Sequence, residues 1–418
     1  MWRPSAAIPG IEWAHERRKT TGEAAMSGVE QLLGALDNAV LAGDAAVLAT
    51  VVRVEGSAYR RPGARMLITA LGQTQGTLSG GCLESEVART AFWLTEQGPA
   101  LRSYSTSDET EDGEVAVSFG LGCNGKVHIL FERVNAESAG LLLGALRTQQ
   151  RDGQARAVAT VITASACLGE RLLWSAKGAV SSGQLPDSLQ AGLSAPLQQA
   201  IAERRSSLHY LEQDAQVLQV LVEYLPPARR LVVFGGGHDA QPLVRMARLL
   251  GWQVTVIDSR AHFARASRFP EADSVLLGTL DDSFNPGPLL QGAAVAVMTH
   301  SLQQDVHWLQ CALASGALYI GQLGPRERTE RLLSEMPALP APALARLHYP
   351  VGLDLGGDTP ESVAMAILAE MTAVLNGRQG GMLKARTASI HDASPIYHHQ
   401  NDAGSDASPF PLSTSERP

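Results

Sequence analysis

Residues 231–240 read LVVFGGGHDA, and this stretch decides the fold of the second half of the chain. The apolar run is typical of a buried strand, the three glycines of a tight turn, and apolar residues then recur at helical spacing up to Leu250. The next apolar strand, residues 253–257, ends at Asp258. This order predicts a Rossmann-like domain with a doubly wound parallel sheet: a strand, a glycine turn, a helix, a second strand and then an acid.

The glycine turn also predicts a phosphate-binding site. Gly235, Gly237 and His238 lie where backbone amides at a helix start attract anions. Asp258 lies where a ribose hydroxyl is bound, so any dinucleotide is expected to be NAD rather than NADP. The fold hosts many ligands, and the pattern leaves open whether NAD, another nucleotide or no dinucleotide binds.

His300 is a further candidate at the same edge of the sheet. It follows the apolar strand 293–298, and ligands bind at the carboxyl ends of parallel strands. The residue is a candidate for acid/base work or phosphate contact. The alternative is a histidine that caps a helix beginning near Gln303.

In the first half of the chain, residues 76–86 read GTLSGGCLESE. We expect Ser79, Gly80 and Gly81 to form a turn and Cys82 to lie at the start of a helix over 83–97. A helix start lowers the pKa of a thiol and favours anions, so the stretch suits a thiolate or an anionic ligand. The alternative is a buried cysteine that only packs the turn.

Two other stretches carry the same chemistry. Arg60, Arg61 and Arg65 lie in a loop rich in glycine and proline, where guanidinium groups suit phosphate or carboxylate. We expect this loop to face the glycine–cysteine turn across a hairpin. Cys123 lies in a second glycine-rich turn, residues 119–125. Cys311 lies among apolar residues of an expected helix, which indicates core packing.

Composition limits the function further. The chain has 418 residues, a net charge of −8 and no basic block, so no nucleic-acid partner is expected. Its apolar runs are too short to span a bilayer, and its four cysteines form no disulfide framework, so a cytoplasmic location is expected.

We expect residues 1–27 and 377–418 to be disordered, and two domains over 28–225 and 229–376, split at Pro226-Pro227. Either Met1 or Met26 could be the natural start.

Taken together, these motifs resemble the xanthine dehydrogenase accessory family (XdhC/CoxI). The resemblance covers about residues 29–376. It is carried by 56–66, 76–84, 120–123, 234–238, 258–260, 268–270, 299–300, 319–321 and 352–354. Two residues depart from the family pattern: Gly236 replaces a usual alanine, and Asp239 stands where a small apolar residue is common and adds negative charge beside the expected anion site.

The resemblance implies an α/β N-terminal domain of the XdhC/CoxI type before the Rossmann-like domain. It also implies a chaperone that binds molybdenum cofactor as cargo, supports its sulfuration by a cysteine desulfurase and inserts it into an apo molybdenum hydroxylase of the xanthine dehydrogenase type. No stand-alone catalysis is then expected, and we expect a homo-oligomer. Which hydroxylase would be the client is left open.

The candidate residues fit such a cargo chemically. Arg60, Arg61 and Arg65 would bind its phosphate, and the thiolates of Cys82 and Cys123 would act as soft donors, with Cys82 a candidate molybdenum ligand. The rival hypothesis is an NAD(P)-dependent oxidoreductase that uses the Rossmann-like domain, with His300 as its acid/base.

Overall fold

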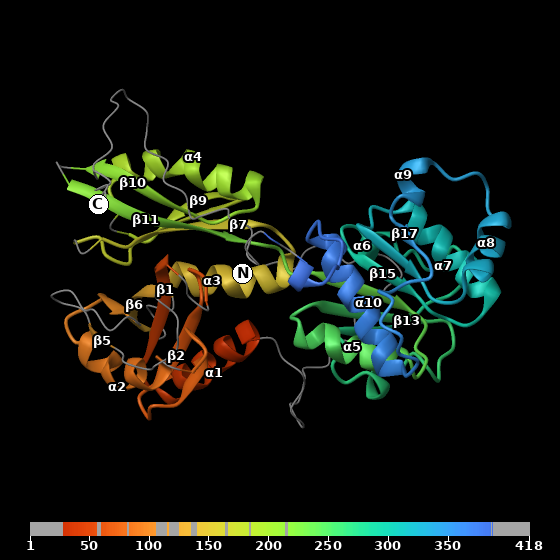
Figure 1. The fold of residues 1–418 in the computed structure, drawn as a ribbon, viewed down its shortest axis with the longest axis horizontal. Helices are drawn as coiled ribbons and strands as arrows, with labels where there is room; N and C mark the ends of the chain where they lie inside the picture. The colour runs from red at the N-terminus through yellow and green to blue at the C-terminus, as the bar shows by residue number, and fades with distance from the viewer. Residues whose placement is uncertain are drawn as a thin grey trace, which may run out of the picture. The chain divides into compact units, whose positions relative to one another are not determined.

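The computed structural model describes residues 28–56, 60–81, 83–105, 115–116, 125–134, 140–163, 166–183, 185–213, 216–385 and 387. These residues form two compact units (Figure 1). The sheet unit comprises the described residues of 44–145 and 155–226, and the Rossmann unit comprises those of 28–43, 146–154 and 227–387. Residues 1–27 and most of the expected C-terminal tail lie outside the described residues. The part of that tail that is described, residues 377–385 and 387, contains the short helix η2 (Leu383–Ala385).

A parallel sheet forms the centre of the Rossmann unit. Its strands lie in the order β14-β13-β12-β15-β16-β17, and every pairing is parallel. The chain starts in the middle at β12, builds outward to β14, and returns to the other side of β12 with β15. This order confirms the doubly wound sheet predicted from the sequence. The strands are β12 (Arg230–Phe234), β13 (Gln253–Asp258), β14 (Ser274–Leu277), β15 (Ala294–Val297), β16 (Tyr319–Gln322) and β17 (Leu347–His348).

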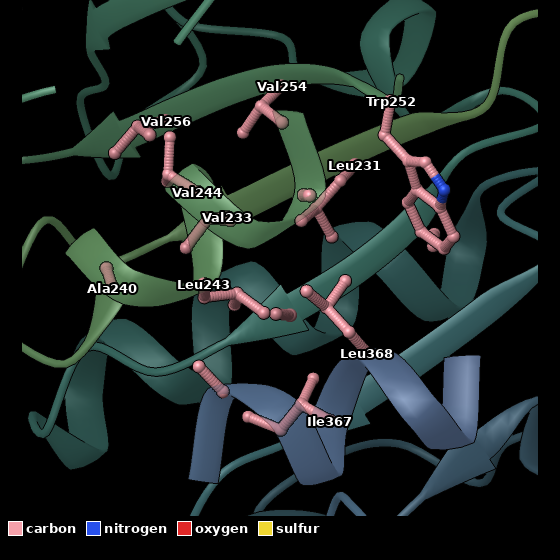
Figure 2. Close-up of a cluster of buried hydrophobic side chains, with 14 of the residues drawn as sticks. Leu231, Val233, Ala240, Leu243, Val244, Trp252, Val254, Val256, Ile367 and Leu368 are labelled. Carbon is pink, nitrogen blue, oxygen red and sulfur yellow. The ribbon is translucent and has the colours of Figure 1, made fainter. Parts of the chain in front are cut away.

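Helices cover both faces of this sheet because successive side chains of each strand point to opposite faces. Leu231 and Val233 pack with α5 and α10, as Figure 2 shows. Val232 and Phe234 pack on the other face, with α7. Burying each such side chain fully stabilises the fold by roughly 1.5–3 kcal/mol. The helical segments of the unit are α1 (Gly28–Ala42), α5 (Ala240–Leu249), η1 (Ala266–Arg268), α6 (Gly287–Leu290), α7 (Leu302–Ala314), α8 (Arg326–Ser334), α9 (Ala341–Leu344) and α10 (Pro360–Leu375).

The sheet unit contains two antiparallel-rich sheets. One has the order β3-β2-β1-β6-β4-β5 and the other β10-β11-β7-β8-β9. The strands of the first sheet are β1 (Ala46–Gly56), β2 (Arg65–Thr69), β3 (Thr74–Gly76), β4 (Ala100–Ser105), β5 (Val115–Ala116) and β6 (Gly125–Val134). Those of the second are β7 (Arg156–Val161), β8 (Arg171–Ser175), β9 (Gly178–Ser181), β10 (Ser207–Gln213) and β11 (Gln216–Leu225).

The two sheets of this unit pack against each other through a small apolar layer. Val52 and Leu130 of the first sheet meet Ile162, Leu208 and Leu221 on the side of the second. The outer face of the first sheet is covered by α2 (Glu84–Leu94), and that of the second by α4 (Asp187–Glu203). Helix α3 (Gly140–Asp152) connects the two sheets in the chain.

Residues 178–194 are rich in glycine and serine, a composition more typical of a loop than of regular elements. These residues hold β9 and the first half of α4. Leu189, Leu193 and Leu197 recur every four residues, so they form one buried stripe against the second sheet. Glycine, serine and the internal Pro196 hid this period, because the helix carries few strongly polar residues on its other side.

Candidate functional site

A single carboxylate organises the Ser-Gly-Gly turn. Glu84 lies in the first turn of α2, and its Oε1 accepts from Thr77 Oγ1 at 2.6 Å, Leu78 N at 3.0 Å and Ser79 N at 2.9 Å. Its Oε2 accepts from Ser79 Oγ at 2.7 Å. The Ser79 hydroxyl in turn accepts from Leu83 N at 3.2 Å, so both sides of the turn are tied to the helix start.

These hydrogen bonds change the protonation of Glu84. Burial by itself raises the pKa of the carboxyl, but the hydrogen bonds from Thr77 and Ser79 outweigh it and lower the pKa from 4.5 to about 2. The group is therefore charged at neutral pH. Gly80 and Gly81 remain exposed, and Gly81 has a φ of 114°, which favours glycine. The turn is thus rigid at its base and open at its tip.

The expected hairpin brings the arginine loop next to this turn. Strand β3 pairs with β2 so that Met66 lies opposite Gly76. A Cβ atom on Gly76 would lie 2.3 Å from the carbonyl oxygen of Arg65, so only glycine fits there. The end of the loop and the start of the turn are therefore in contact.

The three arginines of this loop differ in their surroundings. Arg60 and Arg61 are exposed. Arg65 is nearly buried, and its Nη2 lies 2.6 and 2.7 Å from the two carboxylate oxygens of Glu223 in β11. Its Nη1 donates to Gly63 O at 2.8 Å. Arg65 thus joins the two sheets, and its contact with a ligand stays a prediction, as do those of Arg60 and Arg61.

The candidate cysteines fall into two groups. Cys82 and Cys123 lie outside the described residues, so their roles stay predictions. Cys311 lies in α7 and packs on the core of the Rossmann unit, where burial raises the pKa of its thiol. Cys167 packs at the edge of the second sheet's core. These two surroundings suit structural thiols.

A polar row that the sequence did not reveal crosses three strands of the sheet unit. His128 of β6 lies between Ser103 of β4, with Nδ1 2.8 Å from the hydroxyl, and Glu55 of β1, with Nε2 3.0 Å from Oε1. Arg53 pairs with Glu55 at 2.6 Å and donates to Gln219 Oε1 at 3.2 Å. Burial lowers the pKa of His128, which favours its neutral form.

This row borders a cavity of about 260 Å³ between the two sheets. Arg53, His128 and Gln219 supply its polar lining, and Val52, Leu101 and Ile162 its apolar lining. Gly56, the last residue of β1, lies opposite Gly125, the first residue of β6. The loop with Arg60 and the loop with Cys123 therefore both leave the sheet close to this cavity.

The glycine turn of the Rossmann unit lies at the point where the strand order reverses. Gly235 has a φ of 110°, and a Cβ atom there would lie 2.4 Å from Met298 O. The close approach of the two strand ends thus requires glycine. Gly237 is half-buried and His238 is exposed at the start of α5. Phosphate binding by Gly235, Gly237 and His238 stays a prediction.

Two side chains meet across this reversal point. His300 follows β15, and its Nε2 lies 2.7 Å from Oδ2 of Asp239, which precedes α5. His300 is exposed and has a φ of 61°, a conformation that is strained for a residue with a Cβ atom. Helix α7 begins after Ser301, which is its N-cap residue. The imidazole of His300 bonds to Asp239 and does not cap this helix.

A buried carboxylate fixes the strand end before His300. Asp305 accepts from Thr299 N and Oγ1 at 3.2 and 2.6 Å, from Gln322 Nε2 at 3.2 Å and from Arg328 Nη2 at 2.7 Å. It thereby links the turns after β15 and β16. The sequence alone did not indicate this role, because the partners of Asp305 lie up to 23 residues away.

Asp258, the expected ribose-binding acid, is fully buried. Its Oδ2 accepts from Gly236 N at 2.7 Å and from Arg260 Nη2 at 2.9 Å, and its Oδ1 from Arg260 N and Nε. Burial raises the pKa of this carboxyl, but the bonds from Arg260 and Gly236 outweigh that effect and lower it. Contact between Asp258 and a ribose stays a prediction.

The described residues were compared with two further patterns, a metal site and a membrane-spanning helix. Among the described residues there is no group of three or more His, Cys, Asp or Glu side chains that could hold a metal ion. Within the same residues, no helix combines the length and apolar character needed to cross a bilayer.

Comparison with known proteins follows the same division of the chain. Residues 39–105 match the family described as "XdhC and CoxI family", and residues 231–371 match the "XdhC Rossmann domain". A relative from Bacillus subtilis (strain 168), described as a probable xanthine dehydrogenase subunit, is 33% identical over 327 residues, which are 78% of this chain and 92% of that protein. The fold and these matches define a two-part protein with an XdhC/CoxI segment and an XdhC Rossmann domain. The chain belongs to the XdhC and CoxI family.

Two further proteins are similar. The "Molybdenum cofactor insertion chaperone PaoD" of Escherichia coli (strain K12) is 24% identical over 349 residues, covering 80% of this chain and 85% of PaoD. A crystal structure of a xanthine dehydrogenase from Bacillus halodurans has a TM-score of 0.66 and 28% identity, covering 86% of this chain and 98% of that one. The family resemblance stated from the motifs is therefore confirmed.

Proposed function

We propose that this protein binds molybdenum cofactor, holds it during sulfuration by a cysteine desulfurase, and inserts it into an apo molybdenum hydroxylase of the xanthine dehydrogenase type. The proposal is supported by membership of the XdhC and CoxI family and by similarity to PaoD, a molybdenum cofactor insertion chaperone. The protein then acts as a carrier of its cargo, without turnover of its own.

The observation that carries the proposal is the Ser-Gly-Gly turn held by Glu84. Four hydrogen bonds from Thr77, Leu78 and Ser79 to one carboxylate fix the backbone that leads directly into Cys82. A soft thiolate suits molybdenum, and a fixed backbone limits the entropy that is lost when a ligand binds. We assign Cys82 as the donor to the metal and Cys123 as the second thiolate.

The neighbouring groups complete the proposed cargo site. The exposed Arg60 and Arg61 supply cationic forks for the phosphate of the cargo. The cavity beside His128 supplies both polar and apolar contacts, as a polar heterocycle requires. The arginine loop and this cavity lie at the end of the first sheet at which the two glycine-rich loops are attached.

Purification from molybdate-supplied cells tests this proposal. We expect wild-type protein to carry molybdenum and pterin, and Cys82→Ala to lower its content by about tenfold or more, as loss of a ligand does. Cys167→Ala removes a thiol from the same unit outside the turn and should keep the content of the wild type. Equal content in wild type and Cys82→Ala would remove the ligand role of Cys82.

The client enzyme gives the second readout. Deleting the gene should leave the hydroxylase poor in molybdenum or in its sulfido ligand, and inactive, while its polypeptide remains present. A fully loaded and active client in a deletion strain without a paralogue would contradict the chaperone function. Nicotinamide turnover by the purified protein would then favour the oxidoreductase, with His300 as its acid/base.

A further inference from the structure

The protein's own ion pair occupies the carboxyl end of β13, where a ribose is bound in this fold. Both carboxylate oxygens of Asp258 accept hydrogen bonds, three from Arg260 and one from Gly236 N, at 2.7–3.0 Å. The residue has no exposed surface. A ribose hydroxyl could bond to this carboxylate only after Arg260 had left it, and the departing guanidinium would lose a charged partner.

Positive charge accumulates beside this pair. The guanidinium carbons of Arg260 and Arg268 lie 3.9 and 4.9 Å from the centre of the Phe263 ring, a cation–π arrangement that holds both groups in place. Arg268 Nη2 donates to Gly236 O at 3.3 Å, so its charge is not neutralised by that contact. Its Nε is buried, and among the described residues it has no hydrogen-bond partner. Within the described part of the chain, neither Arg268 nor the exposed Arg265 forms an ion pair.

The start of α5 has the opposite charge. Asp239 lies in the helix-start position, 2.7 Å from His300, and a Cβ atom on Gly237 would lie only 2.5 Å from its Oδ1. A carboxylate of the protein thus lies where the pyrophosphate of a dinucleotide is bound in this fold. At this edge of the sheet the arginine side chains, rather than the helix start, attract a phosphate.

We propose that Arg260, Phe263 and Arg268 form a binding site for a phosphate monoester dianion. Guanidinium forks match the oxygens of a phosphate, and a monoester presents three oxygens and about two charges to them. A 2′-phosphate on an adenosine reaches this place at the end of β13 without displacing Arg260 from Asp258. The site therefore favours NADP over NAD, the reverse of the preference inferred from Asp258 in the sequence. It is independent of the molybdenum proposal.

Calorimetric titration of the full chain at low salt tests the site with four probes: NADP, NAD, 2′-AMP and 5′-AMP. We expect NADP to bind about tenfold or more tightly than NAD, and 2′-AMP to bind more tightly than 5′-AMP. NAD that binds as tightly as NADP would overturn the 2′-phosphate assignment and indicate that Asp258 leaves Arg260 for the ribose. This comparison uses the unmodified protein, so it does not depend on how any variant folds.

Two variants then locate the phosphate. Arg268→Lys keeps the charge but removes the fork, and it should lower the NADP/NAD affinity ratio severalfold. Arg245→Ala, on the exposed face of α5 and paired with Glu271, is the control that should leave the ratio unchanged. A non-nucleotide probe, phenyl phosphate, separates the two sources of the monoester. If phenyl phosphate binds, if Arg268→Lys weakens that binding and if NADP is not preferred over NAD, the site is assigned to a phosphate that is not carried by adenosine. Failure of all five probes to bind would overturn the site.

Discussion

Arg65 of β2 and Glu223 of β11 form a two-pronged ion pair, in which Arg65 Nη2 lies 2.6 and 2.7 Å from the carboxylate oxygens. The side chains are only 10% and 5% exposed. A Cβ atom on Gly63 would lie 2.7 Å from Glu223 Oε1, so the loop backbone also fits closely around the pair. This contact fixes the end of the arginine loop to the second sheet, and it links the proposed cargo loop to the packing of the whole unit.

Removing one partner of this pair should strongly destabilise the sheet unit. Arg65→Gln leaves the Glu223 carboxylate buried without its cation, and we expect a loss of about 3–5 kcal/mol in the free energy of unfolding. Urea denaturation measures it. The exposed pair of Glu86 and Arg89 is the control, and Arg89→Ala should cost less than about 1 kcal/mol. Similar losses in both variants would contradict the structural role of Arg65.

Glu84 should make stability depend on pH in the acid range. Its pKa is about 2 in the folded protein against 4.5 for an unperturbed glutamate, so its stabilisation is complete above about pH 5 and is lost as the pH falls from 4.5 toward 2. Glu84→Gln should lower stability at pH 7 by about 1–2 kcal/mol, a figure reduced for the partial solvent access of the group. The difference between wild type and variant should shrink between pH 5 and 3. A constant difference over this range would show that the charge of Glu84 does not hold the turn.

His300 should lose its backbone strain when it is replaced by glycine. His300→Ala and His300→Gly both remove the bond to Asp239. The difference between their free energies of unfolding therefore measures the cost of a φ of 61° for a residue with a Cβ atom. We expect the glycine variant to be the more stable of the two by about 1 kcal/mol, because the left-handed conformation is strained for alanine. Thermal unfolding of the two variants decides it, and a more stable alanine variant would mean that the turn has relaxed to another conformation.

Gly235 should tolerate no side chain. Gly235→Ala places a Cβ atom 2.4 Å from Met298 O at a φ of 110°, and we expect a loss above about 3 kcal/mol or failure to fold. Gly144 lies in α3, and no described atom outside the adjacent backbone of that helix lies within 4 Å of its Cβ position. Gly144→Ala should therefore stabilise the protein by about 0.5–1 kcal/mol. If Gly235→Ala had a free energy of unfolding equal to or above that of Gly144→Ala, the close approach of the β12 and β15 ends would be contradicted.

Much of the Rossmann unit could be predicted from the sequence because its local signals agree. The glycine turn, the apolar stripe of α5 and the cap at Thr359 each point to the element that forms, and Thr359 Oγ1 does accept from Ser362 N at 3.2 Å. Strands β14 and β17 were not predicted. Strand β14 has four residues and β17 has two, so both are too short to show the period of a strand.

The candidate site was harder to predict, because its contacts join distant residues. Asp239 and His300 are 61 residues apart, and they meet only because β12 pairs with β15. The sequence indicated that strand ends share an edge, but not which strands are neighbours. Glu84 lies close to Ser79, and an acid in the first turn of a helix after Ser and Thr was a usable signal that was overlooked.

Helix α1 has a consequence for how the chain matures. Its Glu30 lies 2.8 Å from Nη2 of Arg248, a buried cation on α5 that also bonds to Trp252 O and pairs with Asp273. The first helix of the described residues therefore belongs to a unit whose other elements are nearly all synthesised much later. It must wait until about two hundred intervening residues have been made, and a fragment beginning at residue 227 should be less stable than the same unit supplied with residues 28–43.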